Sequence, residues 1–515
     1  TPRLPKVFIA GLISQGRLFD KMRSLQTVLV LLVALYASTT TAKFNLEKLR
    51  ANFFNVTGAK GSLYVQSLKY LQREPPVGNS VNRAGSARYT TETIEQKLDH
   101  FDASNTRTWQ MRYMENDAYF KEGGPIFIYV GGEWTISPGR ITNGHFVDLA
   151  KEHNGILFYT EHRYYGQSRP TSDITVENLE YLHVKQALAD LAHFIKYQRE
   201  NYPGLANSKV IMAGGSYSAT MVVWFKHLYP ELLTGGFASS APLLAKVDFK
   251  EYKEVVGRAL RELGSEQCYN RVQNGIATLE TMLVDGRAAE VKAMMKICNN
   301  FDEENDLDVW TLFSSISNLF SGIVQYQTGN DVPDLCDYLL AQEDDVTAIA
   351  KFLLTYVGSG CIDLSYKDTL SYYMDSTYAM GASRPWYYQT CNEYGWYQSS
   401  TSRQQPFGTK FPPLLSTTLC QDVFGDEYTN ENINAKVAQT NVDFGGYSSK
   451  VSNIYQTHGG LDPWSAVGHT EEYGATILPQ TSHCADFGSI SSADIPEMRA
   501  SKEKLAELVR QWLTE

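Results

Sequence analysis

The sequence of 515 residues lacks several features that would each assign it to a large class of proteins. Basic residues are in deficit, with 46 Lys and Arg against 57 Asp and Glu and a formal net charge of -11. This balance argues against a nucleic-acid partner, which favours a basic surface. No group of Cys and His has metal-ligand spacing, and no glycine-rich G-x-x-x-x-G-K loop is present. We therefore expect no metal or other cofactor and no nucleic acid.

Cysteine is absent from the first half of the chain. The seven cysteines all lie between Cys268 and Cys484, which fits a protein of an oxidising compartment. The single glycosylation sequon is Asn55-Val56-Thr57, and such a site is consistent with secretion. The two features together predict a secreted chain that is glycosylated at Asn55.

Long apolar segments are also scarce, and the one near the N-terminus has the pattern of a signal peptide. Met22-Arg23-Ser24 leads into the apolar residues 25–37, and small residues follow up to Ala42. This order predicts a secretory signal peptide at residues 22–42, and the apolar run is too short to span a bilayer. A short buried helix is the alternative. We interpret residues 1–21 as an upstream artefact and expect no membrane attachment after signal removal.

The rest of the chain begins with a mixed, polar stretch at residues 43–88. We predict that this stretch is a loosely ordered, propeptide-like or linking segment. From residue 89 onward, edge-strand patterns give way to runs that are apolar on both faces, which indicates a parallel sheet covered by helices. The predicted strands are residues 93–98, 108–114, 125–130, 155–160, 210–213, 235–241, 452–456 and 475–478, and the clearest helices are residues 188–195 and 505–512.

Between the predicted strand that ends at residue 241 and the one that begins at residue 452, the pattern changes to helix-length segments that carry six of the seven cysteines. We therefore predict an α/β fold with a doubly wound, mostly parallel sheet and an inserted helical cap domain. The sheet domain comprises residues 89–247 and 441–515, and the cap comprises residues 248–440.

One strand-to-helix turn has the pattern of a nucleophile elbow. The apolar run Val210 to Ala213 is followed by Gly214-Gly215-Ser216-Tyr217-Ser218 and then by a helix-compatible segment. Small residues surround such a serine because the turn is strained, and the helix behind it directs N–H groups toward an oxyanion. A plain strand–turn–helix is the alternative, because Ser218 stands where the common pattern has Gly.

A serine nucleophile needs a base, and the base needs a third group that orients it. In the α/β-hydrolase arrangement the carboxylate and then the histidine follow the serine along the chain. Asp462 and His483 lie in this order, each in a loop after a late predicted strand. We predict that Ser216 attacks the scissile carbonyl, that His483 is the general base, and that Asp462 orients the imidazole.

The remaining parts of the site are less strongly specified. The N–H of Tyr217 and that of Gly132 or Glu133 are predicted to form the oxyanion hole. His458 and His469 are competing bases, but both precede the last predicted strand. Asp462 is alternatively a turn residue, His483 a surface group and Asp486 a helix cap.

Five segments resemble one family of serine peptidases, which contains lysosomal Pro-X carboxypeptidase, dipeptidyl peptidase II and thymus-specific serine protease. They are residues 161–168, 214–217, 238–242, 461–464 and 482–484, and residues 248–256 and 388–394 are most similar to the thymus-specific branch. The likeness extends from about Ile94 to the C-terminus. It implies an α/β-hydrolase fold with a helical cap and an exopeptidase that removes dipeptides or a terminal residue, often after proline.

The resemblance also implies a setting for the enzyme. Peptides are the expected substrates, secretion or a lysosomal or vesicular lumen is the expected location, and a homodimer is one option for assembly. Trp464 resembles a wall of the pocket for the residue before the scissile bond, with core packing as its alternative role. Glu133 is expected to meet a substrate amine or to pair with an arginine.

Cysteine pairing is another implication of the resemblance. The implied disulfides are Cys268–Cys336, Cys298–Cys361 and Cys391–Cys420, with Cys484 free beside His483.

The chain also departs from the family pattern. Proline-specific members commonly carry Met four residues after the serine, where this chain has Thr220. Thr220 is therefore expected to border the substrate pocket and to relax any preference for proline. A fourth family disulfide is also absent.

Two other functions compete with the peptidase hypothesis. An esterase or lipase on the same fold is disfavoured by the inserted cap and by the lack of a lipase-like lid helix. A catalytically silent binding or adhesion protein usually lacks the serine or the histidine, and this chain keeps all three groups of the triad.

Overall fold

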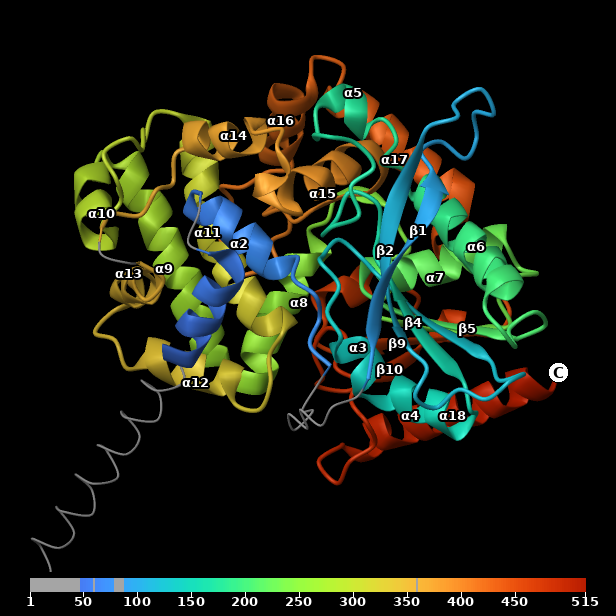
Figure 1. The fold of residues 1–515 in the computed structure, drawn as a ribbon. Coiled ribbons are helices and arrows are strands. Elements are labelled where there is room, and N and C mark those ends of the chain that lie inside the picture. The colour runs from blue at the N-terminus through green and yellow to red at the C-terminus, as the bar shows by residue number, and fades with distance from the viewer. Residues whose placement is uncertain (1–46, 59–60, 78–87, 358–359) are drawn as a thin grey trace, which may run out of the picture.

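The computed structural model describes residues 47–58, 61–77, 88–357 and 360–515. The predicted signal peptide at residues 22–42 and the segment 1–21 therefore lie outside the described residues. Figure 1 shows a sheet with helices on both sides and, next to it, a part built almost entirely of helices.

The sheet has eight strands in the order β1-β2-β4-β3-β5-β6-β9-β10. The two pairs β1·β2 and β2·β4 are antiparallel, and every other pair is parallel. The strands are β1 (Thr90–Lys97), β2 (Thr108–Asn116), β3 (Ile126–Val130), β4 (Ile156–Thr160), β5 (Val210–Gly215), β6 (Gly235–Ser239), β9 (Ile454–Gly459) and β10 (Thr476–Leu478). The prediction of a doubly wound, mostly parallel sheet is confirmed.

The central strands are apolar on both faces because helices cover both faces. In β3, Ile126 and Ile128 face one hydrophobic core while Phe127 and Tyr129 face the other. The first core includes residues of α6 (Val184–Asn201) and α7 (Tyr217–Leu228), and the second includes residues of α4 (His145–Glu152) and α18 (Pro496–Thr514). The short helices α3 (Gly139–Thr142) and α5 (Val176–Leu179) lie in the connections.

The helical part follows β6 in sequence and precedes β9. It consists of α8 (Glu251–Ala259), η1 (Leu260–Gly264), α9 (Glu266–Val284), α10 (Ala288–Met295), α11 (Asp306–Gln325), α12 (Asp331–Leu340), α13 (Asp345–Leu354), α14 (Tyr366–Met374), η2 (Tyr378–Met380), α15 (Ser383–Gln389), η3 (Thr390–Tyr394), α16 (Leu414–Phe424) and α17 (Asn430–Phe444). A two-stranded sheet of β7 (Lys246–Asp248) and β8 (Gly395–Tyr397) joins the start of this part to the segment between η3 and α16. Three short 3₁₀ turns complete the chain, namely η4 (Gly446–Ser448), η5 (Pro463–Val467) and η6 (Glu471–Tyr473).

Helix α11 is the central helix of this part. It is the one described helix that is long and apolar enough to cross a membrane, but 83% of its apolar window is buried by other parts of the protein. Its apolar character is therefore explained by its place in the core of the cap.

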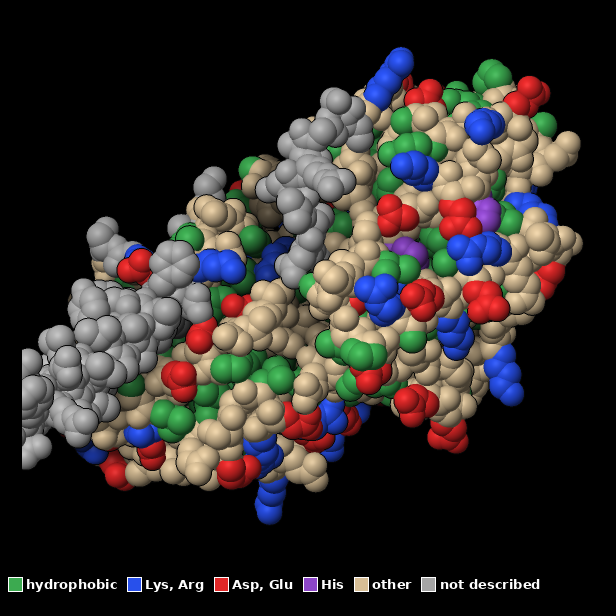
Figure 2. Space-filling model, turned by 90° about the horizontal axis from the view of Figure 1, so that it is seen from below, with side chains coloured by type: hydrophobic (Ala, Val, Ile, Leu, Met, Phe, Trp, Pro, Cys, Tyr) green, Lys and Arg blue, Asp and Glu red, His purple; other side chains and the backbone are tan. Residues whose placement is uncertain are grey.

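The face of the molecule in Figure 2 carries interspersed acidic and basic side chains, without a large patch of either sign.

Part of the segment that we predicted to be loosely ordered is a packed helix. Residues 47–57 are helical, and α2 (Leu63–Leu71) begins at Ser62, whose hydroxyl accepts a hydrogen bond from the N–H of Val65. Helix α2 packs along α11 (Figure 1) and buries Tyr64 and Val65. The expectation of loose order is thus contradicted for residues 63–71, because the helix buries one apolar face against the cap.

Three disulfides lie in the cap and have the pairing that the family resemblance implied. They join Cys268 to Cys336, Cys298 to Cys361 and Cys391 to Cys420. Cys484 is free and buried beside His483. Because each bridge closes a loop of the unfolded chain, the bridges restrict the unfolded state of the cap.

Candidate active site

Ser216 stands at the sharp turn between β5 and α7. Its backbone has φ 60° and ψ -133°, a left-handed conformation that a residue with a side chain rarely adopts. Such a conformation costs about 1–3 kcal/mol and is typical of functional sites. Helix α7 begins directly after Ser216 without a side-chain cap, so its first N–H groups face the space in front of the serine. This geometry is that of a nucleophile elbow.

The neighbours of Ser216 explain why the turn needs small residues. A Cβ at Gly214 would lie 2.3 Å from the carbonyl oxygen of Ser218, and a Cβ at Gly215 would lie 2.8 Å from the ring of Phe487. Ser218 is accommodated because its hydroxyl folds back onto the turn. It donates to the carbonyl of Gly215 and accepts from the N–H of Gly215, both at 2.9 Å.

Asp462 and His483 form a buried pair in the loops that follow β9 and β10. Nδ1–H of His483 donates to the carboxylate of Asp462, with distances of 3.0 Å to Oδ1 and 2.9 Å to Oδ2. The Asp462 carboxylate also accepts from the N–H of Trp464 at 2.9 Å. Burial opposes the charged imidazole, but the charge and hydrogen bond of Asp462, together with Cys484, outweigh burial and raise the pKa of His483 well above its ordinary value.

The elbow and the histidine loop meet at the end of β6. The N–H of Ser216 donates to the carbonyl of Ser239 at 3.0 Å, and the N–H of Cys484 donates to the hydroxyl of Ser240 at 3.0 Å. Within the described residues, Nε2 of His483 has no hydrogen-bond partner, so no bond joins it to Ser216 in this state. Nε2 is the atom that would accept the proton from Ser216, and apo sites often lack this bond.

Ser216 lines a small cavity between the sheet and the cap. Glu133 and Trp464 line the same cavity, with aromatic walls from the cap that include Trp386 and Trp396. Trp464 also packs against the imidazole of His483, with ring centroids 6.3 Å apart. Glu133 is 5% exposed and its Oε2 has no hydrogen-bond partner among the described residues, and burial raises its pKa to about 8.

The residues predicted to form the oxyanion hole lie beside this cavity. Tyr217 is the first residue of α7, and Gly132 follows β3 with one residue, Gly131, between them. Gly132 has to lack a side chain because a Cβ would meet the indole of Trp134 at 2.5 Å. The Tyr217 hydroxyl accepts from Gln389 Nε2 at 3.0 Å and from the Tyr394 hydroxyl at 2.9 Å, which fixes the elbow to the cap.

Thr220 lies elsewhere than we expected. It is fully buried, its hydroxyl donates to the carbonyl of Pro242 at 2.8 Å, and it is not among the described residues that line the Ser216 cavity. The expectation that Thr220 borders the substrate pocket is contradicted, because the side chain one turn after the serine points into the core between α7 and the end of β6.

The competing residues have other contacts. Burial lowers the pKa of His458 to about 4, and neither of its ring nitrogens has a partner among the described residues. His469 stacks on Tyr473. Asp486 accepts from the hydroxyls of Ser239 and Thr457, each at 2.6 Å, and so ties the histidine loop to β6 and β9.

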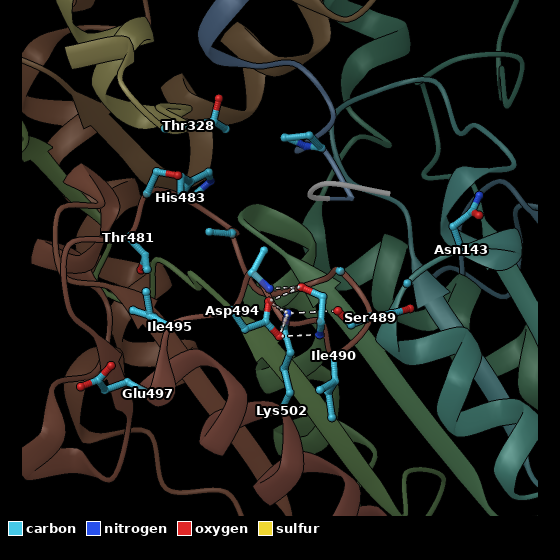
Figure 3. Close-up of a pocket in the computed structure, with 18 of the residues that line it drawn as sticks. Asn143, Thr328, Thr481, His483, Ser489, Ile490, Asp494, Ile495, Glu497 and Lys502 are labelled. Atoms are coloured by element: carbon cyan, nitrogen blue, oxygen red, sulfur yellow. Dashed lines mark hydrogen bonds and ion pairs between the residues drawn. The ribbon is translucent and has the colours of Figure 1, made fainter. Parts of the chain in front are cut away.

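A wide cleft opens on the other side of His483 (Figure 3). Thr328, Thr481 and Asn143 are among the residues of its wall, and an ion pair between Asp494 and Lys502 crosses its floor. Ser216 is not among the described residues that line this cleft. The serine and the histidine thus face two different hollows in this state.

Sequence reasoning missed the residues that the cap places next to the histidine. The N–H of His483 donates to the carbonyl of Gln325 at 3.0 Å, and the ring of Tyr326 lies 6.0 Å from the imidazole. The side-chain oxygen of Gln325 accepts from Nε1 of Trp464 at 3.0 Å. Gln325 ends α11 and carries no local motif, so only the packing of the cap reveals its position.

These geometries define a serine-type peptidase on an α/β-hydrolase fold, and comparison with known proteins agrees. Residues 96–505 match the family described as Serine carboxypeptidase S28. The chain belongs to this family. It is 31% identical over 450 residues to thymus-specific serine protease of Mus musculus, covering 82% of this chain and 87% of that protein.

Two further proteins are more distant. Lysosomal Pro-X carboxypeptidase of Bos taurus is 25% identical over 458 residues, which cover 83% of this chain and 89% of that protein. The solved structure of proline iminopeptidase from Mycobacterium smegmatis has a TM-score of 0.34 and 10% identity, and the match covers 82% of this chain and 99% of that one.

Proposed function

We propose that the chain is a secreted or lysosomal serine exopeptidase that removes dipeptides or a terminal residue from peptide ends through an acyl-enzyme. The observation that carries this proposal is the position of Ser216 on a strained elbow beside the end of β6, where the N–H of Ser216 bonds to Ser239 and the N–H of Cys484, next to the Asp462–His483 pair, bonds to Ser240.

The proposed reaction assigns one role to each group. Ser216 Oγ attacks the scissile carbonyl, His483 Nε2 takes its proton and later gives it to the leaving amine, and Asp462 stabilises the imidazolium. The N–H of Tyr217 and that of Gly132 or Glu133 hold the oxyanion. Each donor of this kind contributes about 3–4 kcal/mol to lowering the barrier.

Glu133 supports action at the amino end of the substrate. It is the single acidic or basic side chain among the described residues that line the Ser216 cavity, and its Oε2 has no partner there. A buried carboxylate without a partner is costly, and an ammonium group would supply one. A carboxyl-terminal group would need a cation instead, and none lines this part of the cavity.

The aromatic walls support a pocket for an apolar residue. Trp464 and Trp386 flank the cavity of Ser216, and an apolar side chain such as the ring of proline gains free energy when its CH groups are buried against an indole. We propose Trp464 as the wall that contacts the residue before the scissile bond.

Two sequence features support a lumenal location. Asn55 is exposed and available for glycosylation, and the three cap disulfides suit an oxidising compartment.

The decisive experiment compares peptides with free and blocked ends. A library with free or acetylated amino ends and free or amidated carboxyl ends is digested and read by mass spectrometry, with Ser216→Ala as the control for contaminating activity. We expect dipeptide release that is lost on acetylation and unaffected by amidation. Cleavage of acyl esters without cleavage of any peptide would contradict the peptidase proposal. Cleavage that is lost on amidation but not on acetylation would show that the enzyme acts at the carboxyl end of the peptide instead of the amino end.

A further inference from the structure

An N-terminal strap, residues 62–77, lies between the cap and the catalytic residues. It comprises α2 and the residues that follow it, and α2 runs beside α11 in Figure 1. Four of its residues, Tyr64, Leu68, Leu71 and Gln72, line the cavity of Ser216. That cavity has a volume of about 70 Å³, whereas ligand pockets usually measure about 300–1,000 Å³. The strap is therefore one reason why the space in front of the nucleophile is small.

The strap occupies the polar groups of the cap that border the catalytic residues. The carbonyl of Leu71 accepts from Nε2 of Gln325 at 3.0 Å and from the hydroxyl of Tyr326 at 2.8 Å. Gln325 is also bonded to the N–H of His483 and to the indole of Trp464. One main-chain carbonyl of the strap is thus bound by the two cap residues that contact the catalytic histidine.

A second polar contact lies further along α11. Nδ2 of Asn318 donates to the hydroxyl of Ser67 at 3.2 Å, and Asn318 itself lines the Ser216 cavity. Behind it, Nζ of the fully buried Lys253 donates to Asn318 Oδ1 and to Ser321 Oγ, both at 2.9 Å. The face of α11 toward the strap therefore presents hydrogen-bonding side chains, which suits it to hold a peptide main chain.

The strap also separates the two hollows of the site. Gln72 lines the cavity of Ser216, and Pro76 lines the cleft that contains His483. Between them, the guanidinium of Arg73 stacks on the rings of Tyr70 and Tyr326, each at 3.8 Å. Glu74 accepts from the hydroxyls of Ser137 at 2.9 Å and Tyr159 at 2.8 Å, and so fastens the strap to the catalytic domain.

We propose that Asn318, Gln325 and Tyr326 form a binding site for the main chain of a peptide substrate, and that the N-terminal strap occupies this site in the resting protein. A substrate carbonyl takes the place of the Leu71 carbonyl on Gln325 and Tyr326 when the strap leaves. Departure of the strap joins the cavity of Ser216 to the cleft of His483. The inference rests on the proposed peptidase function and adds to it an occupied substrate site that has to be vacated.

Point variants test the proposal while leaving the chain intact. Leu68→Ala and Tyr70→Ala remove apolar contacts that hold α2 on the cap, and Gln66→Ala, on the same helix, removes a side chain whose amide donates to the carbonyl of Gly61. If the strap occupies the site in nine molecules of ten, releasing it raises kcat/KM about tenfold. We expect this rise for the first two variants with a fluorogenic peptide and no change for Gln66→Ala. Equal or lower kcat/KM in folded Leu68→Ala and Tyr70→Ala would overturn the proposal.

A second experiment detaches the strap. A recognition sequence for a site-specific protease is placed between Val77 and Tyr89, the full-length protein is cut, and kcat/KM is measured before and after cutting and washing. We expect activation on cutting and competitive inhibition when a synthetic peptide of residues 62–77 is added back. No activation together with no inhibition by the peptide overturns the proposal. If the cut protein loses its thermal transition, the point variants decide.

A fluorophosphonate probe separates failure of this inference from failure of the proposed function. The probe is small and reacts with an activated serine. Labelling of Ser216 at the same rate in all variants, with unchanged peptide cleavage, rejects the occupied site but leaves the peptidase proposal intact. No labelling and no peptide cleavage in any variant rejects the peptidase proposal itself.

Discussion

Nδ1 of His483 lies 2.9 Å from Oδ2 of Asp462 and both side chains are fully buried. This contact fixes the orientation of the imidazole ring, so that Nε2 is directed away from the carboxylate and is free to exchange a proton with another group. The contact also holds a negative charge beside the position where the imidazolium forms.

Replacing Asp462 by Asn keeps the shape of the side chain but removes its charge. The amide can hold the imidazole in the wrong tautomer, so we expect kcat to fall about 10³–10⁴-fold. Steady-state kinetics with a fluorogenic peptide measure the change, and thermal melting checks that the fold is kept. A fall of less than tenfold would show that Asp462 does not orient the base.

The pH profile of kcat/KM reports the protonation of His483. The base has to be neutral to accept a proton, and the Asp462 carboxylate raises the pKa of His483 above 6.5. We therefore expect an acid limb above pH 6.5, with activity rising as the imidazole loses its proton. Because Asp462→Asn removes the charge that raises this pKa, the acid limb of the variant moves to lower pH. A limb that stays in place would mean that another group controls it.

Gly214 tests the geometry of the elbow. A Cβ there would lie 2.3 Å from the carbonyl oxygen of Ser218, which is backbone and cannot move aside. We expect Gly214→Ala to lose about 3–5 kcal/mol of stability and to abolish labelling of Ser216 by a fluorophosphonate. Gly360→Ala is the matched control, because a Cβ at Gly360 meets no atom of the described residues within 4 Å. Normal labelling of Gly214→Ala would contradict the strained turn.

The sequence predicts the parts of the site that have a local pattern. The elbow was predictable because Gly214, Gly215 and Ser216 follow a buried strand. The contact between Asp462 and His483 was predictable because both follow later strands in the order that the fold requires, while the union of Ser216 with this pair stays a prediction. The strands were predictable because runs such as residues 126–130 are apolar on both faces.

The parts that depend on tertiary packing were not predictable. The role of Thr220 was misassigned because its spacing from Ser216 along α7 does not show which part of the protein its side chain contacts. Gln325 and Tyr326 were missed because they end a long apolar helix with no motif. Helix α2 was missed because its partner, α11, lies more than 200 residues away in the sequence, so no local signal shows that its apolar face is covered.

The disulfide Cys391–Cys420 offers a test of how the cap shapes the cavity. It joins η3, whose Thr390 lines the Ser216 cavity, to α16. Replacing both cysteines by Ala is expected to cost about 2–5 kcal/mol of stability and to raise KM for peptides. The Cys298→Ala, Cys361→Ala double variant is the matched control, since neither these two residues nor their sequence neighbours are among the described residues that line that cavity. It should lose stability without a change in KM, and equal KM values in the two double variants would contradict a role of the first bridge in shaping the pocket.

Glu133 predicts a dependence of stability on pH that a glutamine removes. Burial raises the pKa of Glu133 from 4.5 to about 8 in the folded protein, while the unfolded chain has an ordinary carboxyl. Between these two values the folded state holds a proton that the unfolded state has lost, so the free energy of unfolding falls as the pH rises.

The variant Glu133→Gln lacks this proton and keeps the size of the side chain. We expect its melting temperature to equal that of the parent near pH 4.5 and to exceed it increasingly up to pH 8, the window set by the two pKa values. Melting curves at several pH values measure the difference, and Glu177→Gln, an exposed acid of α5, controls for the general effect of removing a charge. A constant difference across the window would mean that Glu133 is ionised in the folded protein at low pH.

The same variant should raise KM for peptides with a free amino end while leaving KM for acetylated peptides unchanged. Stability and substrate binding therefore test the one carboxylate by independent measurements.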